Sequence, residues 1–383
     1  MEPLLSIIIP TRDREKYCIS CVEYMLSVFP LEVQFVIQDN SISELISEWK
    51  EEHNRENVTY NHIYEPLSPI DNFNKAIELA RGKYIIFVGD DDIVLPNAFD
   101  LVKWADSEGV DSIAQKRNVS YLWPNGCRSG ELLEPYVPNS EAIERCDLKK
   151  CLANYLMEGC CDNPRLYHLP SFYHGIIKRT ILDNIKKDTG NYLGGLSSDS
   201  YSATALSFYV TNHIEINKFF TIPGACPSST TVANMQRAHC GELSMAPHLQ
   251  NRKNYKWHVL IPEYYSIQTI WSESVLQALN DTNHNDYLRY FSSEDLFTRA
   301  FVLNPTIRNL IVKETSKVLD AQQRNRLSFY LKASLKVLLY IIIRNTKRVY
   351  GRLFSKRRII KNVQDISDSV AMIPNDLVFI SFK

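Results

Sequence analysis

Three adjacent carboxylates, Asp90, Asp91 and Asp92, directly follow the apolar run 84–88. Such a run predicts a buried strand. Three like charges at the end of a buried strand repel one another unless a partner neutralises them. Mg²⁺ or Mn²⁺ is such a partner, because hard divalent cations prefer oxygen ligands and often share them with phosphate groups. The alternative is a solvated acidic turn that leads into a helix near Pro96.

The segments that must position these carboxylates alternate between strand and helix patterns. Apolar runs predict strands at 4–9, 33–38, 58–64, 84–88 and 111–114. Between them, apolar residues recur at helical spacing, which predicts amphipathic helices. A strand that is apolar on both faces, such as 4–9, is typical of a parallel sheet covered by helices. The order predicts a doubly wound α/β sheet, in which ligands bind beyond the carboxyl ends of the strands.

Polar groups follow three of the predicted strands at this edge: 11–13, 39–41 and 90–92. The chain has no G-x-G-x-x-G after its first strand and no G-x-x-x-x-G-K-S/T. A dinucleotide-binding fold and a P-loop are therefore both disfavoured.

Composition indicates an ordinary globular protein of 383 residues, with 45% hydrophobic and 23% charged residues. The nine cysteines have no regular spacing. Cys18 and Cys21 form a C-x-x-C on a predicted helix, but no second pair completes a zinc site, so we expect both to pack in the core. This cysteine usage suits a reducing compartment, and we expect no secretory signal at the N-terminus.

The segments 7–14, 36–41 and 81–92, together with Pro96, resemble the nucleotide-sugar half of the family 2 glycosyltransferases of GT-A fold. The resemblance implies a GT-A nucleotide-diphospho-sugar transferase fold, with a doubly wound, mainly parallel sheet and a helical C-terminal extension. We expect a catalytic domain at 1–250, whose nucleotide-sugar half is 1–115 and whose acceptor half is 116–250. A helical extension at 251–330 would follow it.

The resemblance also implies a set of residues that bind the nucleotide sugar. Thr11 would meet the base or ribose from the turn that also contains Asp13, and Asp39 would hydrogen-bond the uracil or its equivalent. Lys75 and Arg81 occupy the region in which the family often places a basic residue near the base. Each has a plainer alternative, because 39–41 is ordinary turn chemistry and both cations suit a solvated helix surface.

The aspartate triplet stands where the family has its metal-binding motif. By this resemblance Asp90 would lie on the ribose side, and Asp91 and Asp92 would bind Mg²⁺ or Mn²⁺. Gly89 occupies the position that is acidic in many members. Which of Asp91 and Asp92 is the direct ligand therefore stays open.

A transferase also needs a general base for the acceptor hydroxyl. In inverting members of the family a single carboxylate supplies it, and Asp199 fits this role. It follows Gly194 and Gly195 in the first turn of a predicted helix, which Ser197 or Ser198 would cap. The helix dipole there favours the ionised carboxylate, although an acidic residue in a first turn is also a common stabilising choice. Asp162 is the second candidate.

The segment 224–241 is rich in Ser, Thr and Ala and shows no periodicity. Loops of this length often serve as lids. Arg237 and His239 would reach the diphosphate or the metal when such a lid closes. We expect the other histidines considered for the site, His168, His174 and His248, to be structural or surface residues.

The C-terminal part of the chain is strongly basic. Residues 321–364 contain 12 Lys or Arg and no Asp or Glu, although the whole chain has a formal net charge of −1. The apolar run 337–343 falls far short of the roughly 20 residues that span a bilayer. An apolar helix edged with cations suits the surface of an anionic leaflet, so we expect 331–383 to be a basic amphipathic, membrane-associating tail. The alternatives are a helix packed on the acidic body and a nucleic-acid patch.

Together these features predict a cytoplasmic hexosyl- or N-acetylhexosaminyl-transferase, peripheral on the inner face of the plasma membrane. Its donor would be a nucleotide sugar, with a UDP-sugar expected, and its acceptor a glycan or polyprenyl-linked glycan of a surface polysaccharide. We expect no nucleic-acid partner. The alternatives are a sugar-1-phosphate nucleotidyltransferase, whose Gly-rich signature after the first strand is absent, and a non-catalytic nucleotide-sugar-binding protein.

Overall fold

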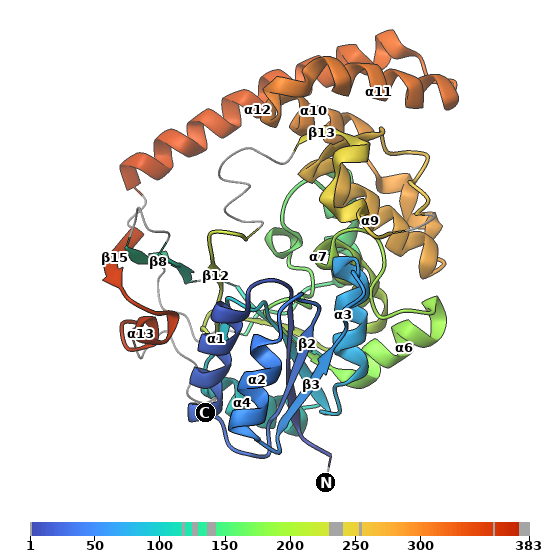
Figure 1. Cartoon of the computed structure of the whole chain (residues 1–383). Coiled ribbons are helices and arrows are strands. Elements are labelled where there is room, and N and C mark those ends of the chain that lie inside the picture. The colour runs from blue at the N-terminus through green and yellow to red at the C-terminus, as the bar shows by residue number, and fades with distance from the viewer. Residues whose placement is uncertain are drawn as a thin grey trace.

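The computed structural model describes residues 2–116, 119–124, 129–135, 143–229, 240–252, 255–354 and 357–374. Its centre is a seven-stranded sheet in the order β10-β6-β9-β4-β1-β2-β3 (Figure 1). Six strands are parallel to one another, and β9 alone runs antiparallel, between β4 and β6. The strands are β1 (Leu5–Thr11), β2 (Gln34–Asp39), β3 (Val58–His62), β4 (Tyr84–Phe87), β6 (Ser112–Gln115), β9 (Gly175–Lys178) and β10 (His213–Ile216).

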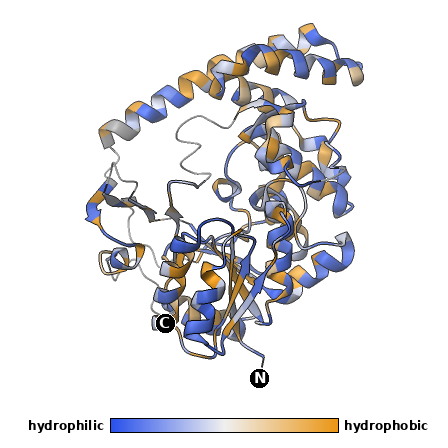
Figure 2. Cartoon of the chain, in the orientation of Figure 1, coloured by the Kyte–Doolittle hydropathy of each residue, from blue (hydrophilic) through white to orange (hydrophobic). Residues whose placement is uncertain are grey.

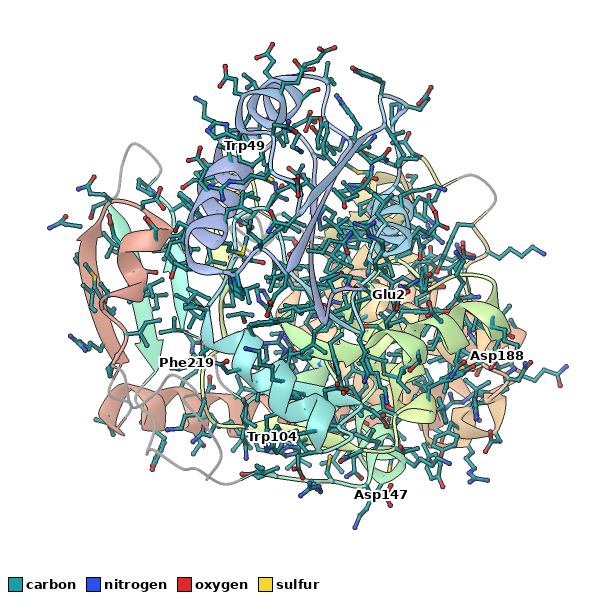
Figure 3. All side chains as sticks on the ribbon, turned by 90° about the horizontal axis from the view of Figure 1, so that it is seen from below. Glu2, Trp49, Trp104, Asp147, Asp188 and Phe219 are labelled. Atoms are coloured by element: carbon teal, nitrogen blue, oxygen red, sulfur yellow. The ribbon has the colours of Figure 1, made fainter. Side chains whose placement is uncertain are left out.

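Helices cover both faces of this sheet. One face packs on α1 (Glu15–Val28), α2 (Leu45–His53) and α4 (Asn97–Ser107). Trp49 of α2 and Trp104 of α4, both labelled in Figure 3, belong to or pack against this core. The other face packs on α3 (Pro69–Glu78), α6 (Arg179–Thr189) and α7 (Ser198–Tyr209). The predicted mixed α/β fold is confirmed.

The side chains of β1 explain why its sequence is apolar without alternation. Ile7 and Ile9 point into the core under α1, whereas Ile8 between them points into the core under α3. Successive side chains of a strand face opposite sides, so a sheet with two covered faces needs an apolar residue at every position. Cys18 and Cys21 are free and fully buried on α1, which confirms their predicted packing role.

Helix starts are set by local hydrogen bonds. Ser197 caps α7 by accepting a hydrogen bond from the amide of Ser200, as predicted. At α3 the cap is Ser68, which accepts from the amide of Asp71. Asp71 therefore lies in the first turn of α3 and not at its N-cap.

Shorter strands and further helices pack around the carboxyl ends of the main sheet. β5 (Ile93–Val94) pairs with β11 (Thr221–Ile222), β12 (Gly224–Ala225) pairs with β7 (Ser120–Leu122), and β13 (Cys240–Glu242) pairs with β14 (Tyr264–Ser266). The helices α5 (Leu148–Met157), α9 (Ile267–Asp281), α10 (Ser293–Leu303) and α11 (Arg308–Ala321) pack beside them. Short 3₁₀ turns join several of these elements, among them η1 (Pro164–Tyr167).

The C-terminal part of the chain returns to the catalytic body. After α12 (Arg326–Phe354), β15 (Arg357–Val363) pairs antiparallel with β8 (Gly130–Pro135), and α13 (Ile366–Val370) packs against α1. Val363 and Ile366 are buried in the same core as β1, and Ser20 of α1 donates a hydrogen bond to Asp365 at 2.7 Å. No local pattern in the sequence predicts this return. No helix within the described ranges is both long enough and apolar enough to cross a membrane.

We expect Ile366→Ala to lower the free energy of unfolding by about 2–5 kcal/mol, because it empties a fully buried site between α13 and α1. Ile359→Ala is the matched control: it removes the same atoms from β15 at a position that is 51% exposed. Urea denaturation followed by circular dichroism measures both. Equal, small losses would show that the C-terminal segment is not docked on the body in solution.

Candidate active site

Two adjoining cavities open at the carboxyl ends of β1 and β4. The first, which we call the turn cavity, has a volume of about 380 Å³ and is lined by 10–14, Asn40, the start of α3, Gly89 and Asp90. The second, the aspartate cavity, has a volume of about 460 Å³ and is lined by Asp91, Asp92, the start of α7 and residues of α9. The cavities share four lining residues: Arg14, Pro69, Phe73 and Tyr173.

Asp90 is held from two sides at the wall of the turn cavity. Thr11 donates to one carboxylate oxygen at 2.8 Å, and Arg14 donates to the other at 2.9 Å. Burial raises the pKa of Asp90 to about 7, although the Arg14 charge opposes the shift. Asp90 is therefore fixed by the protein, and one arginine only partly neutralises the charge around it.

Asp92 is the most fully satisfied of the three carboxylates. One oxygen accepts from the amide of Gly224 at 2.6 Å; the other accepts from the amide of Gly89 at 2.6 Å and lies 3.2 Å from Nε2 of His174. Burial works against ionisation, but His174 and the two amides outweigh it and lower the pKa of Asp92. Asp92 thus ties the end of β4 to β12 and to the loop before β9.

Asp91 has the most available oxygen of the triplet. Its Oδ2 accepts from the amide of Cys226 at 2.8 Å, whereas its Oδ1 has Arg14 only at 3.7 Å. Trp123 fixes the backbone by donating to the carbonyl of Asp91 at 3.0 Å. Burial and the neighbouring charge of Asp92 raise the pKa of Asp91. Of the two residues left open by the sequence, Asp91 is the better placed to take a cation.

The carboxylate oxygens of the triplet can supply part of the ligand shell of a divalent cation. All three carboxylates offer hard oxygen atoms, and Arg14 pairs with Asp90 at 2.9 Å but lies 3.7 Å from Asp91. Mg²⁺ often needs only one or two protein carboxylates, because substrate phosphates and water complete its shell. The triplet can supply one such ligand from Asp91, and it does not form a complete protein cage.

Elsewhere in the described part of the chain, one group of three possible ligand residues converges. Ligand atoms of Glu144, His168 and Glu215 lie within 4.8 Å of one another. Nδ1 of His168 is 2.6 Å from Glu215, and Lys116 forms an ion pair with Glu144. None of the three residues lines the two cavities.

Gly89 is required by the packing around the triplet. A Cβ atom there would lie 2.2 Å from the hydroxyl of Tyr173 and 2.9 Å from Oδ2 of Asp92. This explains why an acidic residue cannot occupy the position in this chain: Tyr173 and Asp92 fill the space. Gly224 is constrained similarly, since a Cβ atom would lie 1.7 Å from the carbonyl oxygen of Asp91.

We expect Gly89→Ala to lower the free energy of unfolding by about 1–3 kcal/mol through overpacking. Tyr173→Phe removes the hydroxyl that the new methyl group would meet first, so the double variant should recover part of the loss. Urea denaturation of the two single variants and the double variant measures this coupling. Additive losses would show that Tyr173 does not restrict the position.

Asp199 lies across the aspartate cavity, in the first turn of α7, as the sequence predicted. Its carboxylate is open to the water of the cavity, but protein surrounds that cavity closely. The resulting desolvation raises the pKa of Asp199, while the charges of Arg165 and His174 oppose the shift. Asp92 and Asp199 both line the aspartate cavity.

The remaining predicted residues fall into different places. Asp13 lines the turn cavity together with Thr11. Asp39 is fully buried and does not line either cavity: it accepts from the amide of Ser41 at 2.8 Å and from Tyr60 at 3.1 Å. Its neighbour Asn40 lines the turn cavity instead.

The two predicted cations and the second base candidate lie away from the cavity linings. Lys75 pairs with Glu78 at 3.2 Å on the surface of α3, and Arg81 is an exposed residue after that helix. Asp162 forms an ion pair with Arg299. Arg237 and His239 lie outside the described residues, so their predicted role in a lid stays a prediction.

Four residues of the site were not foreseen in these positions. Arg14 lies between the cavities, and Tyr173 and His174 approach the triplet from the loop before β9. Arg165 is partly buried and donates to Ser171 at 2.9 Å and to the carbonyl of Tyr173. The sequence could have indicated Arg14, because this residue follows the polar end of the first predicted strand. The other three come from a segment without periodicity.

The family comparison agrees with this geometry. Residues 6–154 match the model of the glycosyl transferase family 2. The predicted enzyme class, a glycosyltransferase, is confirmed. No curated protein sequence gives a significant match.

Solved structures with a similar arrangement are remote in sequence. TarS residues 1–349 from S. aureus, in complex with UDP-GlcNAc, shares 14% identity with a TM-score of 0.46, over 84% of this chain and 93% of that one. The mannosyltransferase PcManGT from Pyrobaculum calidifontis, in complex with GDP-Man and Mn²⁺, shares 12% identity with a TM-score of 0.42, over 88% of each chain. Similarity at this level assigns no substrate and no residue role to this chain.

Proposed function

We propose that the chain is an inverting glycosyltransferase that moves a sugar from a nucleoside-diphosphate sugar to a hydroxyl of a glycan or lipid-linked glycan. A UDP-sugar is the expected donor. One observation carries the proposal: two adjoining cavities share Arg14 and Tyr173, with Asp90 in one and the pair Asp91 and Asp199 in the other. A nucleotide and a sugar joined by a diphosphate need this kind of divided site.

The turn cavity suits the nucleoside. Thr11 and Asn40 offer polar groups at two neighbouring strand ends, and Asp90 is held rigidly by Thr11 and Arg14 beside them. A carboxylate fixed in this way can accept hydrogen bonds from ribose hydroxyls. Arg14 lies at the boundary of the two cavities, where the diphosphate of a bound donor would pass, and its positive charge would attract that group.

The aspartate cavity suits the sugar and the acceptor. Asp199 would accept the proton of the acceptor hydroxyl while its oxygen attacks the anomeric carbon, and the bond to the diphosphate breaks on the opposite side. The raised pKa of Asp199 strengthens it as a base. Ile270 and Trp271 of α9 offer an apolar wall against which a sugar ring can pack.

Asp91 would hold Mg²⁺ or Mn²⁺, with donor phosphate oxygens and water as further ligands. The bound cation would neutralise the charge that develops on the leaving diphosphate. Asp92 would orient Asp91 through the backbone, because it fixes the turn from both sides.

Turnover of a panel of nucleotide sugars tests the proposal. The purified full chain with Mn²⁺ should release a nucleoside diphosphate from at least one donor. NMR of the glycoside formed should show the anomeric configuration opposite to that of the sugar in the donor. Formation of pyrophosphate from a nucleoside triphosphate and a sugar phosphate would instead identify a nucleotidyltransferase. Nucleotide binding without any turnover would identify a non-catalytic binding protein.

A further inference from the structure

The helix α12 has one face fixed to the protein and one that nothing in the described structure covers. Near its start, Phe329 and Ala333 are buried against α10 and α11. Further along the same face, Lys336 pairs with Asp295, and Tyr340 stacks on Arg299 with the guanidinium carbon 5.3 Å from the ring centre. After Phe354 the chain enters β15, which is paired with β8. The start of the helix is therefore packed on the protein, and the chain that follows its end is held by the pairing of β15 with β8 (Figure 1).

The opposite face of α12 is an apolar stripe. Its members recur at intervals of three, four or seven residues and lie on one side of a helix. Each is more than half exposed: Leu327, Leu331, Leu335, Leu338, Ile342, Val349 and Leu353. Leu339, Ile343 and Tyr350 widen the stripe on one flank, at 49–65% exposure. Apolar positions alternate with hydrophilic ones along the coloured part of the ribbon of this helix (Figure 2).

Cations line the other side of the C-terminal half of α12. Arg344, Lys347 and Arg348 recur at i, i+3 and i+4, away from the centre of the stripe, and Lys347 and Arg348 are exposed. No Asp or Glu occurs anywhere in 321–364. An exposed apolar face of this size marks an interaction site, and a Lys/Arg-rich polar face is typical of helices that lie in the headgroup region of a membrane.

We propose that the stripe of α12 docks on an anionic lipid surface. The charge of the helix favours this partner. Docking on a second copy would bring together two helices that each carry cations and no acidic residues, whereas anionic headgroups complement these cations. The helix would lie flat, because it is not apolar enough to span the bilayer. Its 29 residues would give a footprint about 44 Å long.

The attachment of α12 to the protein would restrict how the enzyme is oriented on a lipid surface. A helix on a free tail would tether the enzyme loosely, whereas the first part of α12 packs on α10 and the chain after the helix is held by the β15–β8 pair. The lipid surface would therefore fix the orientation of the whole catalytic body. This proposal does not depend on which sugar is transferred.

Vesicle flotation of the full chain tests the proposal. We expect binding to vesicles of phosphatidylcholine mixed with an equal amount of phosphatidylglycerol, weaker binding to phosphatidylcholine alone, and loss of the difference at high salt. Combining Arg344→Gln, Lys347→Gln and Arg348→Gln should lower partitioning by roughly fivefold per cation. Leu335→Glu with Leu338→Glu should abolish binding to both vesicle types.

Leu31→Glu is the matched control, because Leu31 is an equally exposed leucine, at 70%, in the nucleotide-sugar half. It should bind as the unchanged chain does. Unchanged thermal unfolding of all variants shows that they fold. The proposal is overturned if the unchanged chain ignores anionic vesicles or if the Leu335/Leu338 variant still binds them. It is also overturned if light scattering shows a dimer that this variant dissociates, which would make the stripe an interface between copies.

Discussion

Replacing Asp199 with Asn will lower sugar transfer by about a hundredfold to ten-thousandfold and leave nucleotide affinity unchanged. The amide has the same shape and cannot accept the proton of the acceptor hydroxyl. Asp199 lines the aspartate cavity but not the turn cavity, so nucleoside binding should not sense the change. Steady-state transfer rates and calorimetric titration with UDP measure the two quantities separately.

The pH profile gives this prediction a second readout. Desolvation by the surrounding protein raises the pKa of Asp199 above its ordinary value, so the protonated, inactive form should persist to a higher pH than for an aspartate on an open surface. The transfer rate of the unchanged chain should rise as pH increases through that pKa, and Asp199→Asn should lose this limb. Asp162→Asn is the control, because Asp162 pairs with Arg299 and lines neither cavity. If Asp162→Asn stops transfer and Asp199→Asn does not, the base is misassigned.

The second large effect separates Asp91 from Asp92. Asp91→Asn should cost about a hundredfold or more in metal-dependent transfer, because it removes a charged ligand from the position of the leaving diphosphate. The fold should tolerate it, since only the amide of Cys226 loses a charged acceptor. Asp92→Asn should instead lower the free energy of unfolding by about 1–3 kcal/mol, because it disturbs two buried amides and His174.

Three measurements resolve the pair: Mn²⁺ titration of transfer, Mn²⁺ binding by electron paramagnetic resonance, and urea denaturation. The account expects the metal response to fail in Asp91→Asn and the stability to fall in Asp92→Asn. The reverse pattern would make Asp92 the direct ligand and Asp91 the structural residue.

The parts of the fold that local sequence pattern encodes were predictable. Ile7, Ile8 and Ile9 are all apolar because they serve two cores, and this doubly buried pattern already implies a covered parallel sheet. Pairings between distant segments leave no such pattern. The antiparallel insertion of β9 between β4 and β6, and the return of β15 to β8, depend on contacts across the sequence that no single segment reveals.

The same distinction between local pattern and distant contacts applies to the residues of the candidate site. Two of the predicted residues, Thr11 and Asp91, lie at strand ends, and Asp199 lies at the start of a helix. The topology brings these ends to one edge of the sheet, and all three residues line the cavities. Asp39 also follows a strand, but its carboxylate turns inward to Ser41 and Tyr60, an orientation that spacing cannot reveal. His174 was expected to be structural or a surface residue; the fold buries it against Asp92.

The most direct test of the central claim is a crystal structure of the chain with UDP and Mn²⁺, with data collected at the manganese absorption edge. The account predicts an anomalous peak within bonding distance of a carboxylate oxygen of Asp91, and uridine in the turn cavity beside Thr11 and Asp90. A peak at Glu144, His168 and Glu215 with none at Asp91, or a nucleotide bound outside the turn cavity, would contradict it.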